Sequence, residues 1–358
     1  MGAIGYPLLL RPSYDKKIWG GRRLERVLGK PLPGTAPIGE SLESGDAAVV
    51  LSGPLAGRAL GELARTHGAA LLGERGLAAS RPIGDFPLLV KFIDASDILS
   101  IQVHPDDAGA PEGRRGKTEA WHVVAVEPGA ELITGLTGAH EPERLRAAIA
   151  EGSLAGLLER RVVAPGDTLL VRAGTLHAIG AGVLLYEVQQ NSDVTYRFYD
   201  WERRDAAGRP RELHLGQGLR ALRAEQRAEP VTALEQGEGR ALLAACRYFA
   251  LERWQLRGQM PLPATPGTFR LVSCIAGAAE LRAGGTTTTI QHGQTVLLPA
   301  DLPAGVIDGD ATLLVSSIPD LERDVVAPLR RAGHAPEAIA RLDGGSGDLA
   351  RPIAVAGA

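Results

Sequence analysis

The stretch APGDTLLVRAGTLHA, residues 164–178, aligns without gaps with QHGQTVLLPADLPA, residues 291–304. The alignment sets Gly166 on Gly293, and both copies continue as Gly-x-Thr, a short apolar run and a turn. A short apolar run that follows a turn signal is typical of a buried strand. The repeat therefore predicts two related β-barrels in one chain.

The two copies differ in one chemically important position. His177 of the first copy falls on Ala304 of the second. We therefore expect the first barrel to keep a functional histidine that the second barrel lacks.

Short strands separated by Gly and Pro are predicted on both sides of these copies, which favours an antiparallel sandwich or barrel. The predicted strands lie within residues 86–96, 99–105, 119–128, 130–136, 162–174, 182–190, 194–201, 247–256, 269–277, 278–284, 294–300 and 311–318. Helical patterns are found at residues 56–73, 140–160, 211–223 and 320–341. Residues 225–240 are charged and contain Gly, which is typical of a linker, and the end of the chain after residue 341 is expected to be loose.

The composition excludes several classes of protein. The chain has 358 residues, 44% of them hydrophobic, and a net charge of -3. It contains no basic block, which argues against a nucleic-acid partner, and no apolar run long enough for a membrane span. The two cysteines are too few for a disulfide framework, and no secretion signal is recognisable at the start. We therefore expect a cytoplasmic protein.

The segment LSIQVHPDD, residues 99–107, has an unusual strand pattern. Ile101 and Val103 alternate with Gln102 and His104, and side chains two residues apart share a face of a strand. One face is apolar, and the other presents an amide and an imidazole. Burying such a polar face is costly unless a partner satisfies it.

A divalent metal is the partner that we predict. Gln102, His104, Glu119 and His177 form the candidate ligand set. Two imidazoles and a carboxylate with no thiolate favour zinc in an open, catalytic type of site, with manganese or cobalt as substitutes. A single strand histidine is more often a hydrogen-bonded core residue, and the neighbouring Gln102 and the Gly-Thr-x-His turn favour the metal instead.

Four long blocks together resemble the type I mannose-6-phosphate isomerase family, in its shorter bacterial branch. They are PLLVKFIDASDILSIQVHPDD (87–107), GKTEAWHVV (116–124), GTLHAIGAGVLLYEVQQNSDVTYRFYDW (174–201) and RELHLGQGL (211–219). The resemblance covers residues 7–319 and implies a mainly β protein of the cupin superfamily, with two jelly-roll barrels and peripheral helices. It implies a catalytic domain over 1–240, a second barrel without the metal-site histidine over 241–319, and a tail over 320–358.

The resemblance also implies an activity and a set of site residues. The reaction would interconvert mannose 6-phosphate and fructose 6-phosphate by proton transfer through an enediol-type intermediate. The zinc ligands of the family, one ion per chain, fall on Gln102, His104, Glu119 and His177, and its active-site arginine falls on Arg197. The sugar phosphate would be the partner of a monomer or weak homodimer.

Several residues are candidates for the proton carrier. Glu187 lies in an apolar strand, where an acidic side chain is expected to be paired or catalytic. Lys117, Asp94 and a metal-bound water are alternatives, and the sequence does not choose among them. Ser100, Lys117 and Arg197 are candidates for holding the phosphate, because hydroxyl and basic side chains match its oxygens.

Two other functions use the same fold. An iron-dependent cupin oxygenase would also use two histidines and a carboxylate. A sugar-phosphate sensor would keep the barrel without turnover. The fourth ligand Gln102 and the cations Lys117 and Arg197 argue against the oxygenase, and the intact ligand set argues against the sensor.

Overall fold

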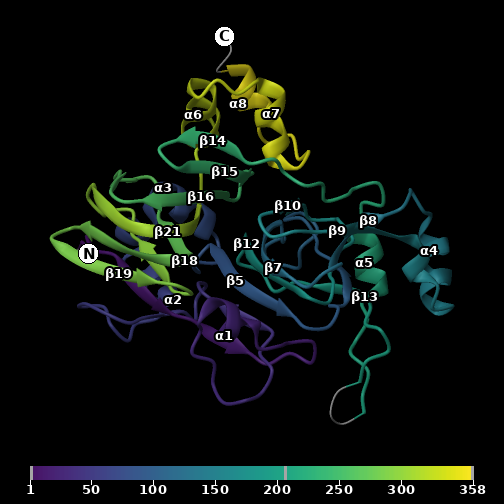
Figure 1. Cartoon of the computed structure of the whole chain (residues 1–358). Coiled ribbons are helices and arrows are strands. Elements are labelled where there is room, and N and C mark those ends of the chain that lie inside the picture. The colour runs from purple at the N-terminus through teal and green to yellow at the C-terminus, as the bar shows by residue number, and fades with distance from the viewer. Residues whose placement is uncertain (1–2, 205–207, 356–358) are drawn as a thin grey trace.

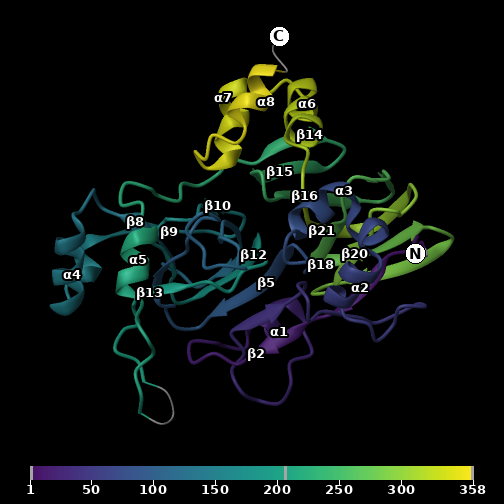
Figure 2. The same ribbon diagram turned by 180° about the vertical axis from the view of Figure 1, so that it is seen from behind.

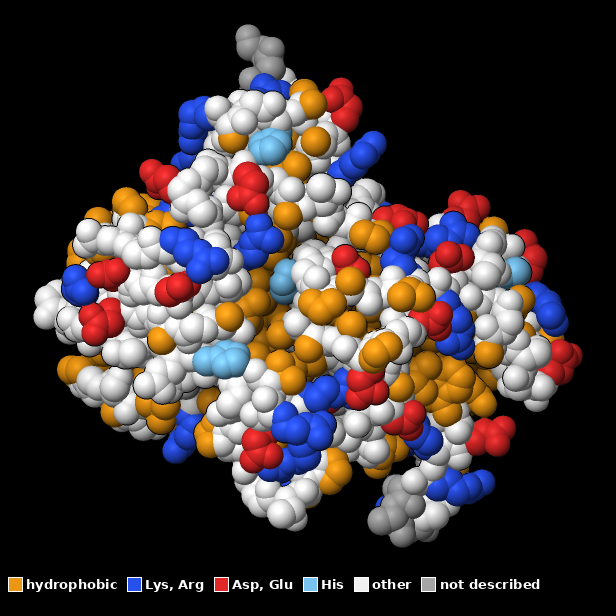
Figure 3. Space-filling view, in the orientation of Figure 1, with side chains coloured by type: hydrophobic (Ala, Val, Ile, Leu, Met, Phe, Trp, Pro, Cys, Tyr) orange, Lys and Arg blue, Asp and Glu red, His pale blue; other side chains and the backbone are white. Residues whose placement is uncertain are grey.

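The computed structural model describes residues 3–204 and 208–355. The fold is mainly β, with two large sheet regions side by side and short helices around them (Figures 1 and 2). No helix of the described residues is both long and apolar enough to cross a membrane. Basic and acidic side chains are mixed over the face seen in Figure 3.

The larger sheet has ten strands and contains most of the second half of the chain. Its main path runs β14-β15-β16-β21-β18-β20-β1-β4, while β17 pairs with β21 and β19 with β18. The strands are β14 (Leu234–Gly237), β15 (Arg240–Ala245), β16 (Ala250–Arg257), β17 (Met260–Leu262), β18 (Arg270–Ala283), β19 (Thr286–Gln291), β20 (Thr295–Leu298), β21 (Gly305–Ser317), β1 (Leu8–Arg11) and β4 (Val49–Val50). Strand β1 therefore crosses from the N-terminus to pair with β20.

The other sheets form the first region. A six-stranded sheet has the order β10-β7-β12-β5-β3-β2, and smaller sheets have the orders β11-β8-β9 and β13-β6. The strands are β10 (Thr168–Val171), β7 (Glu119–Val126), β12 (Val183–Gln190), β5 (Leu88–Ala95), β3 (Glu40–Leu42), β2 (Ser13–Asp15), β11 (Ala178–Ile179), β8 (Glu131–Leu136), β9 (Leu158–Val162), β13 (Tyr196–Tyr199) and β6 (Ile101–Val103). Strands β10 and β20 occupy corresponding positions of the internal repeat.

The helices are short and lie outside the sheets (Figure 1). They are α1 (Arg23–Leu28), α2 (Leu60–Thr66), α3 (Gly68–Ser80), α4 (Pro142–Ala150), α5 (Leu215–Ala221), α6 (Ala327–Arg331), α7 (Pro336–Ala340) and α8 (Ala350–Val355), with 3-10 turns at Leu154–Leu157 and Arg341–Asp343 and a π-helical turn at Leu321–Val326.

Several predicted elements have different limits in the structure. The helix expected over 140–160 ends at Ala150, where Gly152 adopts a positive φ of 70°, and β9 begins at Leu158. The helix expected over 56–73 becomes α2 and α3 and extends to Ser80. The linker expected over 225–240 contains β14.

The segment from residue 342 to Val355 is not loose, contrary to the expectation from the sequence. Leu342 and Leu349 are fully buried in the main hydrophobic core. Asp348 forms an ion pair with Arg247, and the Gly345 carbonyl accepts a hydrogen bond from Arg172. The C-terminal segment therefore contacts both sheet regions, because Arg172 follows β10 and Arg247 follows β15.

Strand β12, in the middle of the six-stranded sheet, is buried on both faces. Phe92 of β5 and Tyr186 of β12 face the core shared with the larger sheet, whereas their neighbours Lys91 and Glu187 face the opposite way. Successive side chains of a strand point to opposite faces, so one sheet can serve two surroundings.

Buried hydrogen bonds cross between the two sheet regions, and we call this group the polar seam. Tyr186 and Ser316 form a hydroxyl pair at 2.8 Å. Lys30 and Glu43 form an ion pair at 2.7 Å, and the Thr295 hydroxyl donates to the Glu43 carboxylate at 2.9 Å. Because buried polar groups are costly unless paired, the polar seam fixes how the two regions pack.

Candidate metal centre

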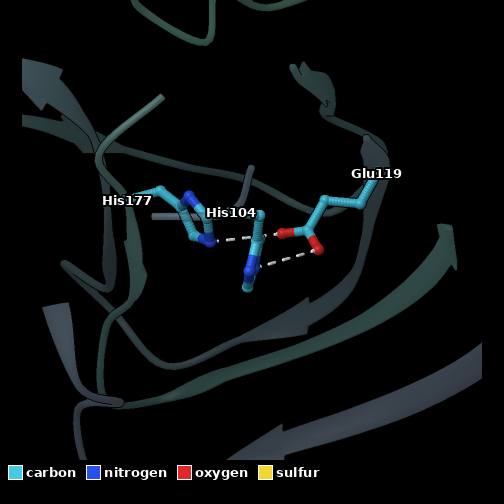
Figure 4. Close-up of side chains that lie close together, drawn as sticks. All are labelled: His104, Glu119 and His177. Atoms are coloured by element: carbon cyan, nitrogen blue, oxygen red, sulfur yellow. Dashed lines mark ion pairs between the residues drawn. The ribbon is translucent and has the colours of Figure 1, made fainter. Parts of the chain in front are cut away.

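Three predicted ligands meet in the first sheet region. His104 follows β6, Glu119 opens β7, and His177 precedes β11. The Nε2 atoms of His104 and His177 lie 3.7 and 3.4 Å from the two carboxylate oxygens of Glu119. All three side chains are at most 1% exposed, and Figure 4 shows both rings directed at the carboxylate.

Backbone carbonyls fix the tautomer of both histidines. The Nδ1 atom of His104 lies 2.8 Å from the Val194 carbonyl, and that of His177 lies 2.8 Å from the Thr175 carbonyl. Because a carbonyl only accepts, each Nδ1 carries the hydrogen and each Nε2 presents a lone pair to the centre. Metal-binding histidines are oriented by the same kind of hydrogen bond.

Burial keeps both rings neutral. It lowers the pKa of His177 to about 4 and places the pKa of His104 well below its ordinary value, where nearby Lys117 adds to the effect. Neutral imidazole is the form that binds metals.

Glu119 supplies the negative charge of this centre. It is fully buried, Lys117 Nζ forms an ion pair with Oε2 at 2.8 Å, and Oε1 accepts no hydrogen bond from any residue that the structure describes. Burial raises the pKa of Glu119, and the Glu187 carboxylate adds to the increase. One ligand atom from each of the three residues lies within 4.8 Å of the others, which fits a divalent cation.

Gln102 lies beside this group. Its backbone exchanges hydrogen bonds with that of His177, and its side-chain amide is 3.4 Å from His177 Nε2. Ser100 donates to the amide oxygen at 3.3 Å. Since an amide can present oxygen or nitrogen in the same place, Gln102 has the chemistry of a fourth ligand.

A cleft of about 400 Å³ opens beside the centre. Gln102 and Lys117 line it, and Lys117 Nζ also lies 3.2 Å from His104 Nε2, so the cleft reaches the ligand group through these two residues. The other predicted residues in its wall are Ser100, Glu187 and Arg197. The volume suits a small polar molecule.

The sequence did not predict the partner of Glu187. Lys91, opposite Glu187 on the neighbouring strand, lies 3.4 Å from its carboxylate and 3.7 Å from Glu40. The Trp121 indole N–H also donates to Glu187 at 2.9 Å. Burial alone would raise the pKa of Glu187, but Lys117 and Lys91 outweigh it and lower that pKa. Asp94 instead pairs with Arg23 at 3.1 Å and does not line the cleft.

Arg197 is brought to the cleft by strand pairing. It stands opposite Gln102 in the β13-β6 ladder, and its Nη1 donates to the Glu212 carbonyl at 2.9 Å. It is therefore held beside the candidate ligand that lines the cleft.

A mainly β fold with a buried His-Glu-His centre beside a polar cleft is typical of the metal-binding cupin enzymes. The family described as phosphomannose isomerase type I, catalytic domain, matches residues 8–122, and the family described as mannose-6-phosphate isomerase, cupin domain, matches residues 240–318.

Relatives match over most of their length. The mannose-6-phosphate isomerase of Streptococcus mutans is 37% identical over 318 residues, covering 87% of this chain and 98% of the relative. Mannose-6-phosphate isomerase ManA of Bacillus subtilis is 37% identical over 322 residues, covering 87% and 99%. The crystal structure of a mannose 6-phosphate isomerase from Bacillus subtilis has a TM-score of 0.78 at 34% identity, covering 87% of this chain and 99% of that one. The chain belongs to the type I mannose-6-phosphate isomerase family.

Proposed function

We propose that the protein interconverts mannose 6-phosphate and fructose 6-phosphate with a zinc ion held by Gln102, His104, Glu119 and His177. The single observation that carries this proposal is the buried Glu119 carboxylate, which faces two neutral imidazoles and forms an ion pair with Lys117 through one oxygen, next to a polar cleft. The reaction is inferred from membership of the mannose-6-phosphate isomerase family. A divalent metal fits the donor set, and zinc is the specific choice that we propose.

The metal would act as a Lewis acid that polarises the sugar carbonyl. Residues of the chain perform the other tasks. In the aldose-to-ketose direction one proton moves from C2 to C1 and a second moves from the C2 hydroxyl to the C1 oxygen, and Glu187 and Lys117 are the proposed proton carriers. Lys91 and Trp121 orient the Glu187 carboxylate, and Lys91 and Lys117 favour its ionised, basic form.

Arg197 serves as a fixed positive charge. A guanidinium keeps its proton at working pH, so it cannot act as the base. We propose that Arg197 stabilises developing negative charge and that Ser100, Lys117 and Arg197 contact the substrate. Their place in one cleft wall supports this assignment.

We further propose a cytoplasmic enzyme that works as a monomer or weak homodimer. Its catalytic unit would be residues 1–240, with a second cupin-type barrel over 241–319 and a C-terminal segment over 320–358. The apolar interior between strands of the larger sheet, which includes Trp254, Val272 and Leu313, supports a second barrel without a metal.

A coupled assay of mannose 6-phosphate turnover tests the function. It is run on the protein as purified, after chelation, and after zinc is added back. Turnover that chelation abolishes and zinc restores is the expected result. A metal-loaded protein that binds sugar phosphates without converting them would contradict the isomerase proposal and favour a sensor.

A further inference from the structure

A second cavity, of about 430 Å³, lies beside residues 105–118, the loop that joins the candidate ligands His104 and Glu119. It shares no lining residue with the cleft beside the metal centre. We call it the loop cavity. Its wall comes mainly from the end of α3 and the residues after it, from the loop itself, and from the turn between β15 and β16. The lining residues are Ala78, Ala79, Arg81, Pro82, Ile83, Pro87, Leu88, Asp107, Gly113, Arg114, Arg115, Gln190, Arg247 and Tyr248.

The wall of the loop cavity combines an apolar part with a cationic part. Pro82, Ile83, Pro87 and Leu88 supply apolar surface, and Ile83 is 41% exposed although it is a large hydrophobic residue. Apolar walls with a few polar groups are the usual form of a small-molecule site, and the volume lies in the usual range. The cavity therefore suits a small molecule with an apolar body.

The ionisable side chains of this wall favour an anion. Four are arginines and one is a carboxylate, Asp107. Three of the arginines form ion pairs with carboxylates that do not line the cavity, namely Arg114 with Asp193, Arg115 with Asp85 and Arg247 with Asp348. Arg81 is exposed and forms no ion pair within the part of the chain that the structure describes. An anionic group in the cavity would therefore meet a guanidinium that is not yet neutralised.

Asp107 ties the loop to both sheet regions. Its Oδ1 accepts hydrogen bonds from the Gly116 N–H and from Gln190 Nε2, each at 2.9 Å. The Tyr248 hydroxyl of the larger sheet region donates to its Oδ2 at 2.8 Å. All three donors are neutral, so Asp107 closes the loop without neutralising an arginine of the wall.

Gln190 connects the loop cavity with the metal centre. Its side-chain amide donates to Asp107 and accepts from the Thr118 N–H at 3.0 Å, and Thr118 directly precedes the candidate ligand Glu119. Asp107 lies three residues after His104, so the two ends of the loop meet at this one amide. A molecule that contacts Gln190 and the arginines of the loop would therefore restrain the segment that positions both ligands.

We propose that the loop cavity is an effector site for an organic anion with an apolar body, of the aromatic carboxylate class. The anionic group pairs with Arg81, and the apolar body lies against Pro82 and Ile83. The bound anion holds the loop in the arrangement that brings His104 and Glu119 together, and it strengthens metal binding because a segment that is already restrained loses less freedom when the metal binds. The site is independent of the proposed function, whereas its coupling to the metal rests on the ligand assignment made there.

Calorimetric titration of the full chain with 2-naphthoate tests the site. We expect one naphthoate per chain, with an affinity that excess fructose 6-phosphate leaves unchanged, because the sugar phosphate enters the other cavity. Arg81→Gln should weaken binding about 10-fold or more, which is the range for losing a hydrogen bond between charged groups. Ile83→Ser should also weaken binding, since it removes apolar contact area. Both residues are exposed, so both variants should fold.

The matched control is Arg257→Gln. Arg257 is exposed and pairs with Asp310 on the larger sheet, so this variant should bind naphthoate as the parent does. A parent protein that does not bind naphthoate would overturn the proposal, and so would an Arg81→Gln variant with the affinity of the parent. Displacement of naphthoate by fructose 6-phosphate would also overturn it, because the anion would then lie in the cleft beside the metal centre.

Zinc affinity, measured against a competing chelator with and without saturating naphthoate, tests the coupling. Zinc should bind about 5-fold or more tightly when naphthoate is bound, and naphthoate should bind the zinc-loaded protein more tightly by the same factor. In Arg81→Gln the same naphthoate concentration should have a smaller effect on zinc. An unchanged zinc affinity in the naphthoate-bound parent would refute the effector role.

The two proposals fail in different ways. A parent protein that binds naphthoate as expected but neither binds zinc nor converts mannose 6-phosphate would refute the proposed function and the coupling, and the anion site would stand. A parent protein that converts mannose 6-phosphate in a zinc-dependent manner but does not bind naphthoate would refute the effector site, and the isomerase proposal would stand.

Discussion

Replacing Lys30 by Met should destabilise the protein strongly while leaving the chemistry of the cleft intact. Lys30 Nζ lies 2.7 Å from Glu43 and donates to the Gly293 carbonyl at 2.6 Å, with both charged side chains 1% exposed. The variant leaves a buried carboxylate without its counter-charge, which costs about 3–5 kcal/mol of unfolding free energy. Hydroxyls of Ser41 and Thr295 still donate to Glu43, so we expect the lower end of this range.

Urea denaturation followed by tryptophan fluorescence measures the effect. With a slope of about 3 kcal/mol per molar for a chain of this size, the midpoint should fall by about 1 M. The double variant with Lys30→Met and Glu43→Gln should recover part of the loss, because it removes the unpaired charge. Lys16→Met, at an exposed lysine, is the control and should change stability by less than about 0.5 kcal/mol.

The kcat of Lys30→Met should stay within about 3-fold of the parent at 25 °C, because the polar seam and the cleft lie on opposite faces of one sheet. A loss of stability below about 1 kcal/mol would refute the argument, and so would a double variant no more stable than the single one.

Three further predictions concern the centre and the cleft. His177→Ala or His104→Ala should abolish both bound metal, measured by elemental analysis, and turnover, whereas the exposed His292→Ala should change neither; full activity in either site variant would refute the ligand assignment. Glu187→Gln should lower kcat about 100-fold to 10,000-fold with metal content unchanged, and a loss of under 3-fold would exclude Glu187 as the proton carrier. The metal-free protein should lose thermal stability as pH falls from 6.5 toward 4, because burial lowers the pKa of His122 and of His177 to about 4, so only the unfolded chain binds these protons in that window. The raised pKa values of Glu119 and Asp94 act in the opposite sense, but they are two groups against three histidines with lowered pKa values, and a Tm independent of pH would contradict the balance.

Local patterns in the sequence predicted much of the first region. The alternation around Gln102 and His104 marked a strand with a polar inward face, and the structure brings His104, Glu119 and His177 together as expected. The acidic side chain of Glu187 in an apolar strand was expected to be paired or catalytic, and the structure pairs it with Lys91. Each signal was local, since the alternation lies within residues 99–105 and Glu187 stands out within its own apolar strand, whereas the partners that the fold brings to them lie far away in the sequence.

Features that depend on distant partners could not be predicted in the same way. Strand β1 pairs with β20 nearly 290 residues later, and nothing within LLLR identifies that partner. Leu342 and Leu349 lie in a Gly-rich segment whose composition predicts a loose chain, yet both are buried in the main core. Asp348, beside Leu349, forms an ion pair with Arg247. The sequence around Arg211 does not mark it as a residue of the cleft. Its position there depends on how residues 211–214 lie along β13.

All eight residues of β12 are buried, and the two faces of the strand contact different parts of the molecule. Leu184, Tyr186 and Val188 pack in the main core, whereas Glu187 lines the cleft. In a saturation scan of β12 scored separately for abundance and for activity, abundance should therefore fall at 184, 186 and 188, and activity at 187. We therefore expect changes in substrate specificity to arise in the loops around the cleft and not on β12. Substitutions on β12 would also change the contact between the two sheet regions.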